Sequence, residues 1–109
     1  MSEQATTLMV FFNLKPGTNE ADYLAWAQEV DLPTVNRLNS VTSFEVFKGL
    51  KMLGQQSASP WDYFEVIRIE SETQFLQEIL SAQMQQVIRQ FEAFATDAHF
   101  ICTRNITTL

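Results

Sequence analysis

A few ionisable side chains stand in otherwise apolar stretches of this 109-residue sequence, and they are the first candidates for chemistry. Burying a charge costs free energy unless the group has a partner or a task, so such positions are informative. They are Asp31, Glu45, Glu65, Arg68 and His99. Carboxyl and imidazole groups commonly carry protons in acid–base catalysis, which makes Asp31, Glu65 and His99 the candidate catalytic residues.

Asp31 has two interpretations, which are compatible with each other. It follows an amphipathic stretch, and at the C-terminal end of a helix both the helix dipole and partial burial would raise the pKa of its carboxyl. A raised pKa would suit proton transfer near neutral pH. The alternative is that Asp31 caps a short turn that begins at Pro33, because Asp favours N-caps and Pro favours the first turn.

Glu65 and His99 are the other candidate proton carriers. Glu65 shares a predicted strand face with Tyr63, Ile67 and Ile69, so it either points into an apolar cavity with a raised pKa or marks where that face meets solvent. His99 is the only histidine, and the ordinary pKa of its side chain, about 6.5, suits acid–base work. A lone histidine at the start of a strand can also be purely structural.

Several polar and aromatic residues could hold a substrate. Asn13, Asn36 and Tyr63 could hydrogen-bond its polar atoms, and aromatic side chains such as Trp26 could hold its ring. Aromatic residues at these spacings are also typical of an ordinary core. Cys102 is the only cysteine, which rules out an intramolecular disulfide, and we expect it to be a small buried hydrophobic residue.

The residue pattern does not indicate a metal or a cofactor. One histidine cannot form a histidine-rich metal site, and no element carries carboxylates at metal-ligand spacing. The glycines, Gly17, Gly49 and Gly54, form no phosphate-binding loop. We therefore expect no metal and no cofactor.

Charge narrows the range of partners. The net charge is −6 and the isoelectric point is about 4.5, which argues against nucleic acid and against anionic membrane surfaces. The first residues lack the basic and apolar regions of a signal peptide, and the longest apolar run, from Leu8 to Phe12, is too short to cross a bilayer. We expect a cytoplasmic protein.

Periodicity predicts one α+β domain over residues 1–109, because the chain length and an apolar content of 46% suit a single core. Strands are predicted at 6–14, 41–48, 61–70 and 99–108, and helices at 19–30, with a break near Leu32, and at 72–95, with a possible kink near Ser81. The stretch from Gly49 to Pro60 is predicted to be a mobile loop. The resulting order, βαββαβ, is that of the ferredoxin-like fold, in which helices cover one face of a four-stranded antiparallel sheet.

The first and third predicted strands carry apolar residues on both faces. A sheet with one face in water would alternate apolar and polar side chains, and two helices can cover only one side. An identical sheet from a second copy is the most economical cover for the other side. The sequence therefore predicts a homodimer with its sheets face to face, enclosing a pocket.

The stretch from Tyr23 to Val46 also carries a family resemblance, in Tyr23-Leu24-Ala25-Trp26, the run from Asp31 to Leu38, Ser40-Val41 and Phe44-Glu45-Val46. In these residues the chain resembles the RedY-like family, whose members are encoded with prodiginine-type pigment pathways. The resemblance implies the dimeric α+β barrel superfamily and a role in secondary metabolism of small, often pyrrole- or indole-type, molecules. Many relatives in that superfamily place a His just before the Pro, whereas Asp31 and Leu32 precede Pro33 here, which weakens any transfer of haem-linked or His-dependent chemistry.

The sequence leaves three functions open. The preferred hypothesis is a cofactor-independent enzyme that cyclises or dehydrates a small aromatic substrate in a water-poor cavity, with Asp31 as the principal acid or base and Glu65 or His99 as its complement. The second is a non-catalytic protein that binds and delivers a pathway intermediate. The third is a monooxygenase of the dimeric α+β barrel type.

Overall fold

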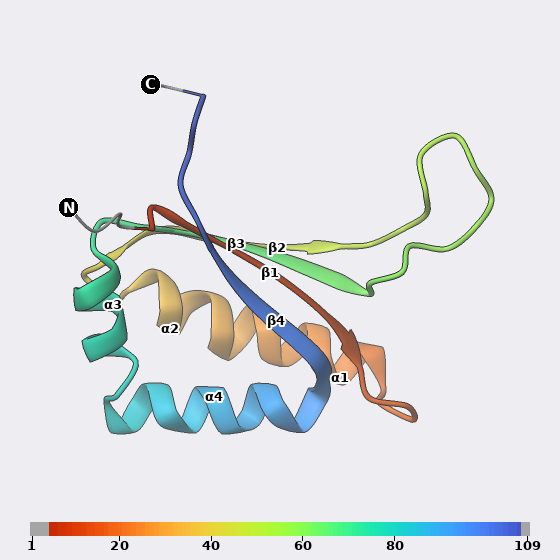
Figure 1. Cartoon of the computed structure of the whole chain (residues 1–109). Coiled ribbons are helices and arrows are strands. Elements are labelled where there is room, and N and C mark those ends of the chain that lie inside the picture. The colour runs from red at the N-terminus through yellow and green to blue at the C-terminus, as the bar shows by residue number, and fades with distance from the viewer. Residues whose placement is uncertain (1–4, 108–109) are drawn as a thin grey trace.

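The computed structural model describes residues 5–107, in which helices cover one face of a four-stranded antiparallel sheet (Figure 1). The strands are β1 (Thr7–Leu14), β2 (Val41–Lys48), β3 (Tyr63–Ile69) and β4 (Ala95–Thr103). The helical segments are α1 (Glu20–Trp26), a π-helical turn η1 (Ala27–Asp31), α2 (Leu32–Asn36), α3 (Glu72–Glu78) and α4 (Ala82–Phe94). The predicted ferredoxin-like α+β fold is confirmed.

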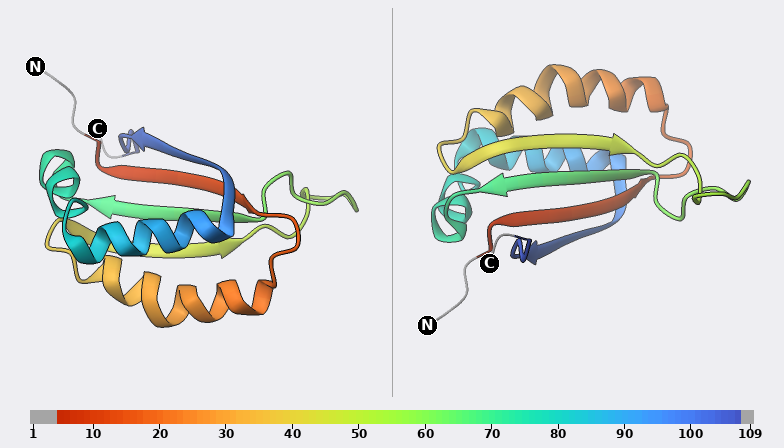
Figure 2. Two further views of the ribbon diagram at one scale, coloured as in Figure 1. Left: turned by 90° about the horizontal axis from the view of Figure 1, so that it is seen from below. Right: turned by 90° about the horizontal axis from the view of Figure 1, so that it is seen from above.

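The sheet has the strand order β2-β3-β1-β4, so β1 and β3 are central and β2 and β4 are edges. Both views in Figure 2 show the helices on a single side, with the opposite face of the sheet bare. On β1 the buried side chains of Leu8, Val10 and Phe12 point toward the helices, while those of Met9 and Phe11 point away. This alternation follows from the two-residue period of a strand.

Polar side chains cap the helices where the sequence predicts their starts. The Asn19 carboxamide oxygen accepts hydrogen bonds from the backbone N–H groups of Ala21 (2.9 Å) and Asp22 (3.4 Å). The Ser71 hydroxyl accepts one from the N–H of Gln74 at 3.1 Å. Ser81 caps a further helix, so the single helix predicted for residues 72–95 is two, and the kink expected near Ser81 is a complete break.

The predicted break near Leu32 is absent. The chain stays helical from Glu20 to Asn36, and the irregularity lies earlier, in the π-helical turn η1. Pro33 stands in the first turn of α2, where its missing N–H removes little. A wider turn thus accommodates the proline without interrupting the helix.

Strand β4 begins at Ala95, four residues before the predicted start at His99. Its first residues contain an irregularity: Asp97 has a φ of 54°, and the pairing with β1 shifts between Phe11 and Asn13. Such a bulge bends the strand and changes the direction of its side chains. The strand ends at Thr103, and the last predicted strand residue, Thr108, lies outside the described residues.

The loop between β2 and β3 extends away from the body of the molecule (Figure 1). It carries a single bridge, Lys51 to Ala58, and exposes Leu50 and Leu53. Gly49 permits its base to close, because a Cβ there would lie 2.2 Å from the carbonyl oxygen of Trp61. No helix among residues 5–107 is both long enough and apolar enough to span a membrane.

Candidate active site

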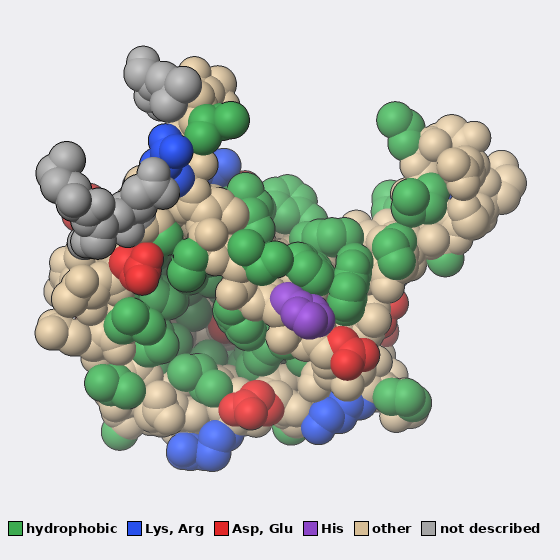
Figure 3. Space-filling view, in the orientation of Figure 1, with side chains coloured by type: hydrophobic (Ala, Val, Ile, Leu, Met, Phe, Trp, Pro, Cys, Tyr) green, Lys and Arg blue, Asp and Glu red, His purple; other side chains and the backbone are tan. Residues whose placement is uncertain are grey.

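A cavity of about 440 Å³ lies between the inner face of the sheet and the helices. Figure 3 shows a hollow on this side of the molecule, between α3, α4 and β4, with hydrophobic side chains around it. The lining residues are Asp31, Val35, Phe44, Glu65, Ile67, Phe75, Ile79, Met84, Val87, Ile88, Phe91, Glu92, Ala98 and Phe100. This cavity lies within a single copy of the chain. It is distinct from the pocket predicted between two face-to-face sheets, which stays a prediction.

The π-helical turn brings Asp31 into the cavity. The buried residues of this helical path are Tyr23, Ala27, Asp31 and Val35, each four residues after the last. A regular α-helix rotates about 100° per residue, so three steps of four residues would drift about 120° around its axis. The wider turn from Ala27 to Asp31 offsets part of that drift and keeps the four side chains on the inner face.

Asp31 does not act as a helix cap. Its backbone is helical, with φ −65° and ψ −57°, and its side chain makes no capping hydrogen bond to α2. A capping residue has an extended backbone, which the continuous helix does not allow here. The capping interpretation of Asp31 is therefore wrong, and the residue is buried, with only 5% of its surface exposed.

Glu65 reaches the same cavity from the sheet. It stands on the inner face of β3, where its cross-strand neighbours are Val10 on β1 and Val46 on β2. The residue is only 4% exposed. Of its two interpretations, the one in which it points into an apolar cavity agrees with the structure.

Burial sets the protonation of both carboxyls. It raises the pKa of Asp31 to about 7, and it raises the pKa of Glu65, with a smaller contribution from the negative charge of Asp31, to about 8. Because the two groups interact, they titrate as a pair. Near neutral pH the pair therefore holds a proton and can also accept one.

Two buried polar atoms at this site, one of them on Glu65 itself, lack hydrogen-bond partners. Neither the Tyr23 hydroxyl nor the Glu65 Oε2 atom makes a hydrogen bond. Burial, followed by the charges of Glu65 and Asp31, raises the pKa of the Tyr23 hydroxyl, which keeps it a neutral donor. Buried polar groups without partners are rare and call for an explanation.

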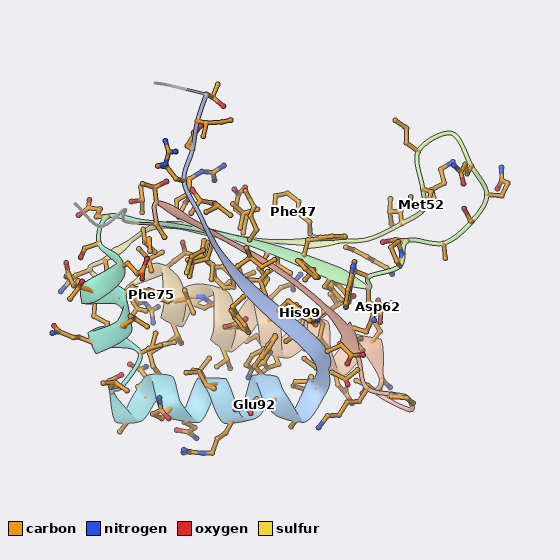
Figure 4. All side chains as sticks on the ribbon, viewed as in Figure 1. Phe47, Met52, Asp62, Phe75, Glu92 and His99 are labelled. Carbon is orange, nitrogen blue, oxygen red and sulfur yellow. The ribbon has the colours of Figure 1, made fainter. Side chains whose placement is uncertain are left out.

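His99 lies on the opposite face of the sheet. Its ring stacks on Phe11, with centroids 5.2 Å apart, and meets the edge of Trp61 at 5.5 Å. Figure 4 shows His99 on β4, with Phe75 on α3 and Glu92 on α4. The structure thus separates His99 from Asp31 and Glu65, because alternate residues of a strand face opposite sides.

The four residues predicted to bind substrate connect structural elements and do not line the cavity. The Asn36 side chain donates to the carbonyls of Leu32 and Phe44 and accepts from the Phe44 N–H, which joins α2 to β2. Asn13 accepts from the N–H of Asp62 at 2.8 Å.

The aromatic members of that set are also structural. The Trp26 indole donates to the Gln90 side chain at 2.8 Å, which ties α1 to α4. The Tyr63 hydroxyl donates to Glu20, and its ring packs against Phe12. Their hydrogen-bonding groups are thereby occupied.

Sequence reasoning missed the apolar walls of the cavity and the unpartnered Tyr23 hydroxyl. Phe75 and Ile79 have the spacing of one helix face, and Met84, Val87 and Phe91 have the spacing of another, but these spacings do not locate the break at Ser81 that separates α3 from α4. The repeat of four residues from Tyr23 through Ala27 to Asp31 is the sequence signal that could have placed Tyr23 and Asp31 on the same face of the helix. Cys102 is exposed on the edge strand β4, so the prediction that it is buried is wrong.

Similarity to known proteins was found at two levels. Residues 6–106 match the family described as REDY-like protein HapK. No curated protein matches the sequence. Among solved structures, HapK from Hahella chejuensis superposes with a TM-score of 0.73 at 21% identity, covering 94% of this chain and 93% of that one.

Solved structures with lower sequence identity to this chain share the fold. The protein At3g17210 from Arabidopsis thaliana superposes with a TM-score of 0.78 at 10% identity, covering 95% of this chain and 98% of that one. A mutant of SnoaB from Streptomyces nogalater, a cofactor-independent oxygenase, gives a TM-score of 0.67 at 9% identity, covering 99% of this chain and 100% of that one. Fold likeness at such identities does not transfer activity. The match over residues 6–106 does establish the family, and this chain belongs to the REDY-like HapK family.

Proposed function

We propose that this protein is a cofactor-independent acid–base enzyme that cyclises or dehydrates a small aromatic intermediate, of pyrrole or indole type, inside the cavity of each protomer. One observation carries the proposal: two buried carboxyls, Asp31 and Glu65, converge at an apolar cavity. Their pKa values, about 7 and about 8, lie where a proton carrier works best at neutral pH. The pyrrole or indole type of the substrate follows from the family resemblance alone.

The pair supplies both halves of a proton transfer. The ionised carboxylate of Asp31 takes a proton from the substrate. The protonated carboxyl of Glu65 gives one either to a hydroxyl, which leaves as water, or to the oxygen of a carbonyl whose carbon is attacked in the cyclisation. The pair shares a proton near neutral pH, and we assign the ionised form to Asp31 as the principal acid or base. The mostly apolar lining of the cavity lowers the local dielectric constant, which strengthens both interactions.

The remaining lining suits a flat ring system. Phe44, Phe75, Phe91 and Phe100 line the cavity, and its volume lies in the range of small-molecule sites. Aromatic walls of this kind hold a planar ligand by offset or edge-to-face contacts. The substrate is thereby positioned against the carboxyls, which is itself a large part of catalysis.

A homodimer completes the proposal. On the outer face of the sheet Met9, Phe47 and Ile101 are 43%, 48% and 46% exposed, over strands from β2 to β4. An apolar face of this kind marks an association surface, and a second copy of the same sheet is self-complementary to it. His99, with its stack on Phe11, lies on this surface.

The test is conversion of small pyrroles and indoles that carry an aldehyde or alcohol group, followed by mass spectrometry, with wild type and Asp31→Asn. We expect Asp31→Asn to lower turnover by about 10²- to 10⁴-fold, the range for loss of a placed proton carrier, with folding intact. The matched control is His99→Asn, which removes the only imidazole but lies on the other face, and it should keep wild-type turnover.

Other outcomes would favour other functions. Ligand binding without conversion by the wild-type protein would replace the enzyme with a carrier. Oxygen consumption in step with product would replace acid–base chemistry with oxygenation. Equal turnover by wild type and Asp31→Asn would remove Asp31 from the reaction.

A further inference from the structure

The polar groups of the cavity are of one kind. Among residues 5–107, the side chains that line it are apolar except for three carboxyls, those of Asp31 and Glu65 inside and that of Glu92, which is exposed on α4 (Figure 4). The lining thus includes no Lys, Arg or His in this part of the chain. A ligand in this cavity meets hydrogen-bond acceptors or neutral acids, and no fixed positive charge.

One of the cavity carboxyls has an oxygen atom without a hydrogen-bond partner. Glu65 is buried, with 4% of its surface exposed, and its Oε2 atom has no hydrogen-bond partner. A buried acceptor without a donor costs free energy, and a donor on the ligand would remove that cost. Nitrogen-borne donors, such as a ring N–H or an ammonium group, have the required polarity.

The negative charge of the protein and of its cavity gives a second reason to expect a cationic ligand. The protein carries a net charge of −6, and an anionic ligand would place a further negative charge beside two carboxyls in an apolar surrounding. A cationic ligand would instead compensate the ionised carboxylate, and the pair could then lose its remaining proton. Binding of a cation should therefore release protons near neutral pH.

We propose that the cavity selects its ligand by charge: it accepts an aromatic ring system whose polar end is a nitrogen-borne donor, binds the cationic form most tightly, and rejects the same ring bearing a carboxylate. The proposal rests on the site described under the proposed function, but it concerns binding and does not require turnover. A carrier protein with this cavity would show the same selection.

Three ligands with the same indole ring separate the charges: tryptamine as the cation, indole as the neutral ring and indole-3-propionate as the anion. Isothermal titration at pH 7.5 gives the dissociation constant of each for the wild-type protein as purified. We expect tryptamine to bind at least about tenfold more tightly than indole-3-propionate, with indole between them. Titration in two buffers of different ionisation enthalpy should show proton release with tryptamine.

Matched variants test which carboxyl causes the preference for the cationic ligand. Glu65→Gln should abolish most of the preference for tryptamine, and Asp31→Asn, measured in parallel, provides a second reading should the first variant fold poorly. Glu70→Gln makes the same substitution just beyond the end of β3, on an exposed residue outside the cavity lining, and should keep the full preference.

Several results would overturn the proposal. They are equal binding of the cation and the anion, tighter binding of the anion, and no binding of any of the three ligands at millimolar concentration. A loss of preference in Glu70→Gln as large as in Glu65→Gln would also overturn it, because general charge would then suffice. Absence of turnover with any substrate would count against the proposed enzyme but would leave this charge selection standing.

Discussion

The two faces of the sheet are both apolar, yet they hold ionisable groups in opposite ways. On the inner face Glu65, together with Asp31 from the helical layer, is buried at an apolar cavity without a compensating cation among its described lining residues. On the outer face Glu45 forms an exposed ion pair with Arg68 at 3.1 Å, and His99 stacks on an aromatic ring. A charge that keeps its solvent or partner costs little, whereas burial of the inner pair costs free energy, and this cost is the argument for the proposed function at the cavity.

The largest expected effect concerns the pH dependence of stability. Burial raises the folded-state pKa values of Asp31 and Glu65 to about 7 and about 8, above their unfolded values. Between about pH 4 and pH 8 the folded protein therefore binds more protons than the unfolded chain, so the free energy of unfolding falls as pH rises. We expect Asp31→Asn and Glu65→Gln each to raise it by about 3 kcal/mol at pH 9, and to have little effect at pH 4.

Urea unfolding followed by circular dichroism at pH 4, 7 and 9 measures this effect. Glu45→Gln on the outer face is the control, and it should change the free energy of unfolding by less than about 1 kcal/mol at each pH. A pH-independent difference between wild type and Glu65→Gln would show that Glu65 is not the buried acid described here.

The second prediction concerns the outer face. Met9→Asp places a charge on β1, one of the two central strands, and should weaken the proposed dimer by about 100-fold, because an unpaired carboxylate would be desolvated in the interface. Sedimentation equilibrium gives the dissociation constant. Leu24→Asp, at a residue on α1 that is 36% exposed, introduces the same charge on the helical side and should leave the dimer unchanged. A dimer that tolerates Met9→Asp but not Leu24→Asp would use the helices.

The smallest expected effect is a difference in stability between variants of two buried tyrosines. Tyr63→Phe removes a hydroxyl that donates to Glu20 and should cost about 1 kcal/mol of stability. Tyr23→Phe removes a buried hydroxyl without a partner, so we expect no loss and a gain of up to about 1 kcal/mol. Thermal unfolding of both variants at one pH makes the comparison. A larger loss in Tyr23→Phe would mean that its hydroxyl is satisfied in solution.

The fold was largely predictable, because strand alternation and helix caps are local signals. Residues 41–48 form a strand with the predicted bounds, and Asn19 and Ser71 cap helices as expected. The errors fall where local signals conflict with tertiary packing. The strand was predicted to start at His99, whereas β4 begins at Ala95 and contains the irregular residue Asp97.

The site was predictable only in part. Asp31 and Glu65 stood out because a carboxyl in an apolar stretch is visible in the sequence. Their placement in one cavity depends on strand register and on a π-helical turn, neither of which has a reliable sequence signal. His99, Asn36 and Tyr63 were selected by residue type, and residue type does not reveal that a side chain faces away or is already hydrogen-bonded.

The π-helical turn at Ala27–Asp31 also has a consequence for how this site could arise or be lost. Such a turn holds one residue more than an α-helical turn, so it is equivalent to a single-residue insertion in the helix. In a regular helix the eight-residue step from Tyr23 to Asp31 would place their side chains about 80° apart. Deleting one residue among Gln28, Glu29 and Val30 would remove the wide turn but leave Tyr23 and Asp31 seven residues apart, about 20° from two full turns, so both would still lie on one face. A relative that is one residue shorter in this segment can therefore keep the site, and a one-residue gap here in an alignment would not mark its loss.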